Sequence, residues 1–378
     1  MRILWNIKWL SIFLCFHITA CTNPEDNNIV RNTSNLSPIL ATENNEGFKT
    51  ATTPRDFIFP QDHGSHPDFK TEWWYVTGNL ETKTQRKFGF QITFFRWGIS
   101  PDQPQSESQW ATNQIYMAHF SITDTKNQQH YAFERFSREA LKLAGSQTHP
   151  FKVWLLDWSL NSKNEQFFPL KLNAKQENVE INLNFDSIKP HILQGDRGLS
   201  KKSATPGNAS YYYSYTRLKT HGAITINDET FSVIGNSWLD REWSTSALEK
   251  NQLGWDWFSL QLSNGQEIMF YQLRNKNGQI DQASSGSYIN EDGKATKLSQ
   301  DQVLIKPLTF WKSPSGTEYP STWNFSIPSK NIKLHIKPHI ENQEIDLSVR
   351  YWEGAVGITG DINSNNITGN GYVELSGY

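Results

Sequence analysis

The sequence predicts an all-β protein of antiparallel strands, on two observations. After residue 55, apolar residues recur at every second position, as in residues 88–94 (FGFQITF) and 179–185 (VEINLNF), which is typical of half-buried strands. Turn signals such as Asn264-Gly265 and Asn277-Gly278 follow at short spacing and predict hairpins. Meanders with this many strands avoid exposed edges by closing into barrels or packing as sandwiches. The pattern alone leaves both architectures open.

The amino terminus predicts export and lipid anchoring. Basic residues precede a short apolar run over residues 9–16, and small residues precede Cys21, as in a bacterial lipoprotein signal that is cut before the cysteine. The run is short for a membrane span, which disfavours the alternative of a signal-anchor helix. We expect a signal peptide over residues 1–20 and lipidation at Cys21. Because Thr22 follows, we expect an outer-membrane lipoprotein that faces the periplasm.

The segment after the signal predicts a disordered tether over residues 21–54, because it is rich in Asn, Thr, Ser, Glu and Pro. Cleavage leaves Cys21 as the single cysteine, so no disulfide is expected and stability must come from hydrophobic cores. The net charge of −2 and the absence of a basic run argue against nucleic acid as a partner. Residues 137–143 give a short, weakly amphipathic pattern that predicts a helix.

Three strings combine large aromatic rings with acidic groups. They are residues 72–80 (EWWYVTGNL), 235–243 (GNSWLDREW) and 254–262 (GWDWFSLQL). Such combinations are expected where a barrel is plugged, or where an apolar pocket carries a few polar groups.

With residues 59–67 (FPQDHGSHP), 351–356 (YWEGAV) and 371–378 (GYVELSGY), these strings resemble the AttH or hydroxyneurosporene-synthase-like family, also described as carotenoid 1,2-hydratase-like. The resemblance covers nearly everything after residue 55. It implies two lipocalin-like (calycin-type) antiparallel β-barrel domains, which we place at residues 55–244 and 245–378.

The resemblance also suggests a plug for the first barrel. Lipocalin-like barrels carry a Trp near the start of the first strand that closes one end. Trp73 and Trp74 are the candidates in this chain.

Motifs for several enzyme classes are absent from the sequence, including G-x-S-x-G, G-x-G-x-x-G, phosphate loops and H-E-x-x-H. His63 and His66, next to Asp62, have the chemistry of metal ligands or of a base for Ser65. We interpret them instead as loop residues that bond to the backbone. The sequence therefore predicts no metal and no cofactor.

Asp240, Arg241 and Glu242 allow two interpretations. In the favoured one, Arg241 is forked onto a carboxylate in a structural ion-pair network that caps a barrel. In the other, Asp240 or Glu242 is kept protonated by apolar neighbours such as Trp238 and acts as a general acid. Asp256 also allows two interpretations. In the favoured one its carboxylate accepts hydrogen bonds from backbone amides, and in the other it is a partly desolvated acid.

Two functions remain. With 22 Phe, 15 Trp and 13 Tyr, the chain carries a surplus of aromatic area, which favours a binding protein for a lipid or isoprenoid-like apolar molecule. The structural alternative is that these rings fill two wide barrels. The resemblance implies a second function, a cofactor-free hydratase or cyclase of the hydro-lyase class that protonates an isoprenoid alkene with a carboxylic acid. A secreted hydrolase would need a nucleophile that the sequence does not supply.

Both functions use the aromatic-acidic strings, which define the candidate site residues. Candidate catalytic residues are Asp240, Glu242 and Asp256, and candidate ligand-binding residues are Glu72, Trp73, Trp74, Tyr75, Trp238, Arg241, Trp255, Trp257 and Tyr271.

Overall fold

The computed structural model describes residues 34–35, 45–245 and 248–378. The predicted signal peptide and Cys21 lie outside these residues. Regular structure in the described residues consists of β-strands and three short 3-10 helices, at Gln61–His63 (η1), Gln300–Gln302 (η2) and Pro328–Lys330 (η3). The all-β prediction is confirmed.

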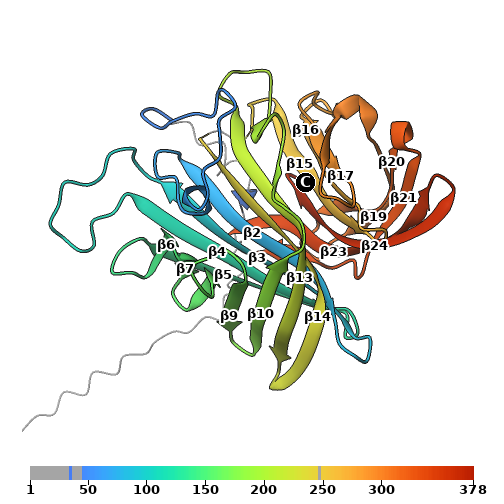
Figure 1. Ribbon diagram of the computed structural model, residues 1–378, viewed down its shortest axis with the longest axis horizontal. Helices are drawn as coiled ribbons and strands as arrows, with labels where there is room; N and C mark the ends of the chain where they lie inside the picture. Colours follow the sequence, from blue (N-terminus) through green and yellow to red (C-terminus); the bar gives the residue numbers. More distant parts are fainter. Residues whose placement is uncertain (1–33, 36–44, 246–247) are drawn as a thin grey trace, which may run out of the picture. The chain divides into compact units, whose positions relative to one another are not determined.

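The first sheet takes the amino-terminal half of the chain. Its strands are β2 (Thr71–Glu81), β3 (Lys87–Gly98), β4 (Gln114–Asp124), β5 (Gln129–Arg138), β6 (Ala144–Thr148), β7 (Phe151–Leu155), β8 (Trp158–Ser162), β9 (Leu170–Gln176), β10 (Val179–Ser187), β11 (Ile192–Leu193), β12 (Leu199–Lys201), β13 (Ala209–Ile226) and β14 (Glu229–Ser244). They are hydrogen-bonded in the order β5-β4-β3-β2-β14-β13-β10-β9-β8-β7-β6, with β11 and β12 attached to β13 (Figure 1).

The second sheet follows in sequence. Its strands are β15 (Gln252–Leu262), β16 (Glu267–Asn275), β17 (Ser285–Ile289), β18 (Ala295–Ser299), β19 (Leu304–Lys312), β20 (Glu318–Ile327), β21 (Ile332–Pro338), β22 (Glu344–Asp346), β23 (Val349–Ile362) and β24 (Asn365–Ser376). The order is β18-β17-β16-β15-β24-β23-β21-β20-β19, with β22 attached to β23. The short strand β1 (Ser34–Asn35) also pairs with β23, in parallel.

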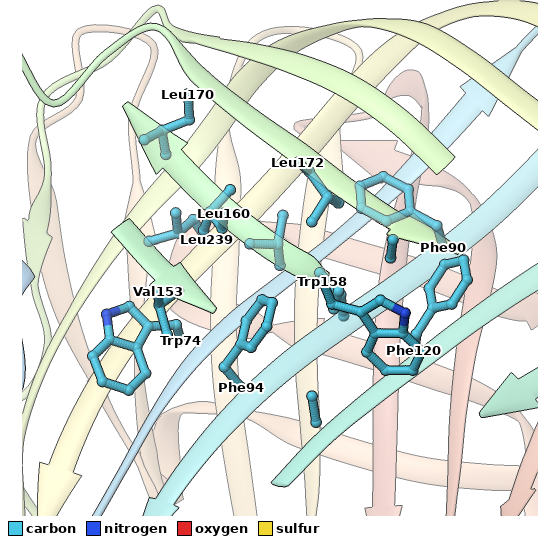
Figure 2. Packing of buried hydrophobic residues seen from close by; sticks show 14 of the residues in the cluster. Trp74, Phe90, Phe94, Phe120, Val153, Trp158, Leu160, Leu170, Leu172 and Leu239 are labelled. Carbon is cyan, nitrogen blue, oxygen red and sulfur yellow. The ribbon is translucent and has the colours of Figure 1, made fainter. Parts of the chain in front are cut away.

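Each sheet surrounds a hydrophobic core of its own. Figure 2 shows the first core, in which Trp74, Phe94 and Phe120 lie among aliphatic side chains and Trp158. The second core is built around Phe258, Trp323 and their neighbours. The antiparallel sheets and separate cores confirm the predicted pair of lipocalin-like barrels. The domain limit at residue 244 stays a prediction.

Of the two candidate plugs, Trp74 is the one inside the first barrel. It is 1 % exposed, and its Nε1 donates to the carbonyl oxygen of His63 at 2.9 Å. The guanidinium of Arg241 lies 4.0 Å from the Trp74 ring centroid. Trp73 points to the other face of β2 and is only half-buried, because successive side chains on a strand alternate between faces.

This alternation leaves both faces of the central strands buried. On β14, Leu239 and Trp243 pack in the first core. Trp238, from the opposite face, belongs to a third cluster that also contains Trp257 and Tyr271 of the second sheet. The third cluster joins the two sheets, and the polar side chains that alternate with the core residues must therefore lie between them.

Two predictions about local structure are wrong. Residues 137–143 do not form a helix: β5 runs to Arg138, and Leu141 and Lys142 both have positive φ, which turns the chain toward β6. The predicted tether is ordered over residues 45–54, where Ala51 is fully buried against the first core. The hydroxyl of Tyr211 also donates to the carbonyl of Thr53 at 2.9 Å. Although residues 45–54 contain few apolar side chains, the burial of Ala51 and the hydrogen bond to Thr53 hold this segment against the first barrel.

Trp74→Ala should lower the free energy of unfolding by about 3–5 kcal/mol, because it deletes a fully buried ring. Trp73→Ala is the matched control and should cost clearly less, since its ring lies on the half-buried face. Urea denaturation of both variants measures the difference. Equal losses would contradict the assignment of Trp74 as the plug.

Candidate functional site

A cavity of about 100 Å³ lies between the two sheets and is lined by side chains from both. From the first half of the chain come Trp73, Tyr75, Thr93, Phe95, Lys202, Tyr212, Asp240 and Glu242, followed by Leu248; from the second sheet come Trp255, Trp257, Tyr271, Leu273, Tyr351, Glu353 and Glu374. Aromatic rings and four carboxyl groups thus line one space between the sheets. Pockets that combine an apolar wall with a few convergent polar groups are typical of binding and active sites.

Strand register explains why these residues meet. In the first sheet Tyr75 of β2 is paired with Asp240 of β14, which in turn is paired with Ser214 of β13. In the second sheet Glu353 of β23 is paired with Glu374 of β24. Directly paired residues point to the same face of a sheet, so each row projects its side chains toward the cavity together.

Asp240 is a buried hydrogen-bond acceptor at one wall. Its Oδ1 accepts from the Ser214 hydroxyl at 2.5 Å and from Trp238 Nε1 at 2.6 Å. Its Oδ2 accepts from the Tyr212 hydroxyl at 2.6 Å, and that hydroxyl accepts from Trp257 Nε1 at 3.2 Å. Burial raises the pKa of Asp240 to about 7, against the lowering effect of these three donors.

Glu242 has a positive partner. Its Oε1 lies 2.9 Å from Lys202 Nζ, and it also accepts a hydrogen bond from Ser210. Burial works to lower the pKa of Lys202, but Glu242 outweighs burial and the pKa is raised. Lys202 and Glu242 thus form a buried salt bridge, and Lys202 is the one cation among the described residues that line the cavity.

Glu353 and Glu374 form the opposite wall. The hydroxyl of Tyr75 donates to Glu353 Oε1 at 2.7 Å, and Trp255 Nε1 donates to Glu374 Oε1 at 3.0 Å. Glu353 Oε2 is buried and has no hydrogen-bond partner among the described residues. Neither carboxyl group forms a salt bridge within the described part of the chain.

Both carboxyl groups hold protons more tightly than usual. Burial, followed by repulsion from Glu374, raises the pKa of Glu353 well above its ordinary value. Burial raises the pKa of Glu374 to about 7, and the charges of Glu242 and Asp240 add to the shift. Because like charges on directly paired residues are destabilising, ionisation of both groups together is disfavoured.

Arg241 belongs to a structural ion-pair network, as the favoured interpretation expected, but its carboxylate partner is Glu72 and not the adjacent Asp240 or Glu242. The Arg241 side chain enters the first barrel, where Nη2 lies 2.9 Å from Glu72 Oε2 and Nη1 donates to the Trp73 carbonyl at 3.0 Å. Asp240 and Glu242 flank it in sequence, but on a strand they point to the other face, toward the cavity. The ion-pair network exists, with Glu72, Arg96 and Arg241 as its members. Arg96 and Arg241 outweigh burial and lower the pKa of Glu72.

The cavity brings together only part of the predicted site. Asp240, Glu242, Trp73, Tyr75, Trp255, Trp257 and Tyr271 line it. Trp238 touches it indirectly, through Asp240 and Trp257. Glu72, Trp74 and Arg241 lie inside the first barrel.

Asp256 also lies away from the cavity. Its Oδ1 is 2.9 Å from Arg274 Nε and accepts from the Tyr378 hydroxyl at 2.8 Å. Its partners are thus side chains, not the backbone amides that the sequence suggested.

Sequence reasoning missed Glu353, Glu374 and Tyr351. All three occur in the carboxy-terminal strings, and each alternates with residues of the second core such as Trp352 and Val373. A signal for the two acidic residues was present in the sequence. In a strand that is apolar on both faces, each acidic residue stands at a position that points away from the core of its own sheet.

In the described residues no group of three or more His, Cys, Asp and Glu side chains is placed to hold a metal ion. The same part of the chain contains no helix that is long and apolar enough to cross a membrane.

The AttH-like family model matches residues 50–378. The chain belongs to the AttH-like family. A crystal structure of an AttH protein from Nitrosomonas europaea is 32 % identical and superposes with a TM-score of 0.78, covering 88 % of this chain and all of that one. The family identification suggested by the aromatic strings is confirmed.

More distant relatives share the fold. Kievitone hydratase from Nectria haematococca is 16 % identical, with a TM-score of 0.66 over 88 % of this chain and 96 % of that chain. A curated relative, dehydratase asqC of Emericella nidulans, is 20 % identical over 223 residues. The match covers 56 % of this AttH-like chain and 62 % of the length of that dehydratase.

The raised pKa of Glu374 predicts how stability depends on pH. An acid whose folded pKa is raised contributes stability below its unfolded pKa and loses it as pH rises through the folded value, here about 7. Glu374→Gln removes this loss, and its amide oxygen can still accept from Trp255.

The stability of Glu374→Gln relative to wild type should therefore increase between about pH 4.5 and pH 7, by about 1–3 kcal/mol. Thermal or urea unfolding across this range measures it, with the exposed Glu318→Gln as control. A difference that stays constant with pH would show that Glu374 ionises normally.

Proposed function

We propose that this protein is a hydro-lyase that adds water to, or removes water from, a largely apolar small molecule held between the two sheets. One observation carries the proposal: Glu353 is a buried carboxyl group with a raised pKa and an unpartnered oxygen. Its other oxygen accepts from Tyr75. A neutral Glu353 therefore has one O–H to donate to a ligand in the cavity that it lines.

Removal of water then follows from acid catalysis. Glu353 donates its proton to a hydroxyl group of the substrate, the C–O bond breaks, and water leaves. The neighbouring C–H bond gives up its proton to a base in the cavity wall, and the electron pair of that bond forms the alkene. In the reverse direction the alkene carbon is protonated, and the attacking water returns a proton to the Glu353 carboxylate. A general acid in this position contributes about 10²–10⁴-fold.

The aromatic side chains that line the cavity can stabilise the positive charge that develops on the substrate when the C–O bond breaks. Trp257 packs edge to face with Tyr75, at 5.3 Å between ring centroids, and with Trp238 at 6.3 Å. The negative face of an aromatic ring stabilises a developing carbocation, and the nearby carboxyl groups add to that field. Tertiary or allylic centres, such as those of acyclic terpenoids, match this environment best.

The second candidate is a binding protein for a lipid or isoprenoid, which the aromatic wall also favours. A purely apolar ligand, however, would cover the buried oxygen of Glu353 without offering it an acceptor. Leaving such a group unsatisfied costs about 1–3 kcal/mol. A ligand with a hydroxyl group accepts a hydrogen bond from this group, and that difference favours the hydro-lyase.

The relatives support the same choice. The names of kievitone hydratase and dehydratase asqC denote addition and removal of water. Both are distant from this chain in sequence, so their substrates do not transfer, and the proposal takes from them only the class of reaction.

Glu353→Gln should fold normally and lower turnover of acyclic terpenoids and their tertiary alcohols by about 10²-fold or more, because the amide cannot donate a proton as an acid does. Gas chromatography of hydration and dehydration products measures the rate. Glu318→Gln, an exposed change on β20, is the control. Full activity in Glu353→Gln would remove Glu353 from the mechanism, and wild-type binding of terpenoids without turnover would favour the binding protein.

We also propose that the protein is exported and anchored to the outer membrane through Cys21, facing the periplasm. This rests on the sequence of residues 1–21, which lies outside the described residues. Cys21→Ser should move the protein from the membrane fraction to the soluble periplasmic fraction with its melting temperature unchanged. Fractionation and immunoblotting measure this, and persistence of the variant in the membrane fraction would contradict lipidation.

A further inference from the structure

Tyr351 lines the cavity, but its hydroxyl group forms a hydrogen bond to a histidine and not to Glu353 or Glu374. It lies two residues before Glu353 on β23, hence on the same face of the strand. Its Oη is 2.7 Å from Nδ1 of His119, a fully buried residue on β4 of the first sheet. The two rings stack at 5.6 Å between centroids. A hydrogen-bonded path therefore leaves the cavity and enters the other sheet.

The path continues to the molecular surface. Nε2 of His119 lies 3.0 Å from Oε2 of Glu134, its direct cross-strand partner on β5. The Glu134 side chain is 14 % exposed. Burial works to raise the pKa of Glu134, but hydrogen bonds from His119 and Ser348 outweigh burial and the pKa is lowered. Glu134 is therefore a carboxylate that solvent can reach.

This carboxylate fixes the tautomer of His119. A carboxylate only accepts hydrogen bonds, so Nε2 must carry the proton that it shares with Glu134. When the ring is neutral, Nδ1 is then an acceptor, and the Tyr351 hydroxyl donates to it. The lone pairs of Tyr351 Oη remain free for a ligand in the cavity. The order of hydroxyl, imidazole and carboxylate is the same as in a catalytic triad, where a carboxylate orients a histidine that accepts a proton from a hydroxyl group. Here the hydroxyl group is the phenol of Tyr351.

We propose that Tyr351 is the general base of the site, with His119 and Glu134 as positioning residues: His119 takes the phenolic proton during the step, and Glu134 orients the imidazole ring. The inference rests on the proposed function. During removal of water, the substrate C–H bond breaks and its proton goes to Tyr351 Oη. The phenolic proton passes to His119 Nδ1 in the same step, and the Glu134 carboxylate stabilises the imidazolium. His119 then returns its Nδ1 proton to Tyr351 Oη, which releases the proton taken from the substrate to water, while Glu353 is protonated again from water and the Nε2 proton stays in the hydrogen bond to Glu134.

The surroundings of Tyr351 favour this coupled transfer over a free phenolate. Burial raises the pKa of Tyr351 well above its usual value, and the acidic groups that face it add to the shift. The titratable groups around it are His119, Glu134, Glu353, Glu374 and Tyr372. An additional negative charge among these groups is unfavourable, so Tyr351 accepts a proton only as it gives one to His119.

Asp240 is a weaker choice for the base. Its two oxygens already accept three hydrogen bonds, from Ser214, Trp238 and Tyr212. These bonds favour its ionised form, whereas taking a proton from substrate would disrupt at least one of them. Asp240 instead fixes the rings of the wall.

The first test needs no substrate. In protein labelled with ¹⁵N-histidine, the His119 signals, assigned by their loss in His119→Gln, should show a neutral ring protonated at Nε2 at neutral pH. Glu134→Gln should shift the population toward the Nδ1-protonated form, and Glu134→Asp should restore the wild-type signals. A wild-type ring protonated at Nδ1 would overturn the relay whether or not any substrate is turned over.

The second test uses the terpenoid panel. Tyr351→Phe should lower kcat by about 10²-fold with KM little changed, and Glu134→Gln should lower kcat less and alter its pH profile. Tyr288→Phe, a half-buried tyrosine outside the cavity, is the control. If wild type and Glu353 variants behave as the proposed function requires but Tyr351→Phe keeps full kcat, the relay is wrong and the hydro-lyase stands. If Tyr351→Phe unfolds, His119→Gln tests the same loss.

Discussion

The burial of four carboxyl groups against one ammonium group determines the properties of the space between the sheets. Asp240, Glu242, Glu353 and Glu374 line the cavity, and Lys202 pairs with Glu242. Removing charge from water is costly, and unpaired carboxylates at close range repel one another. Among the described residues, Asp240, Glu353 and Glu374 have no cation of their own in the cavity, and burial raises the pKa of each. Carboxyl groups that hold their protons more tightly than usual are a direct consequence of this packing.

The strand alternation of the two barrels produces that packing. Each central strand gives one face to its own core and the other to the space between the sheets, as with Trp74 and Tyr75 on β2. The first barrel keeps its own buried charge, Glu72, fully paired with Arg96 and Arg241. The buried carboxylate inside the first barrel is thus paired with cations, whereas three of the four carboxyl groups between the barrels have none in the described part of the chain. Tyr75, which donates to Glu353, and His119, which bonds to Tyr351, connect the two sheets across the cavity.

The sequence was sufficient for the fold and for part of the site. Period-two alternation predicts the strands, and the aromatic strings identify Trp257, Asp240 and Glu242 as residues of interest. The role of Arg241 could not be predicted by treating residues adjacent in sequence as partners in space, since neighbours on a strand face opposite sides. Glu353, Tyr351 and His119 come from strands far apart in the chain. Only the register of each sheet and the contact between sheets bring them together.

The central claim is that Glu353 is a neutral carboxylic acid at the pH at which the protein works. Infrared difference spectroscopy measures this directly, since the carbonyl stretch of a neutral carboxylic acid is separate from the bands of a carboxylate. The account predicts such a band in wild type at about pH 7, where an ordinary Glu would be ionised, and its loss in Glu353→Gln but not in Glu318→Gln. A wild-type spectrum that is the same with and without Glu353 would show that this group is ionised and would contradict the mechanism.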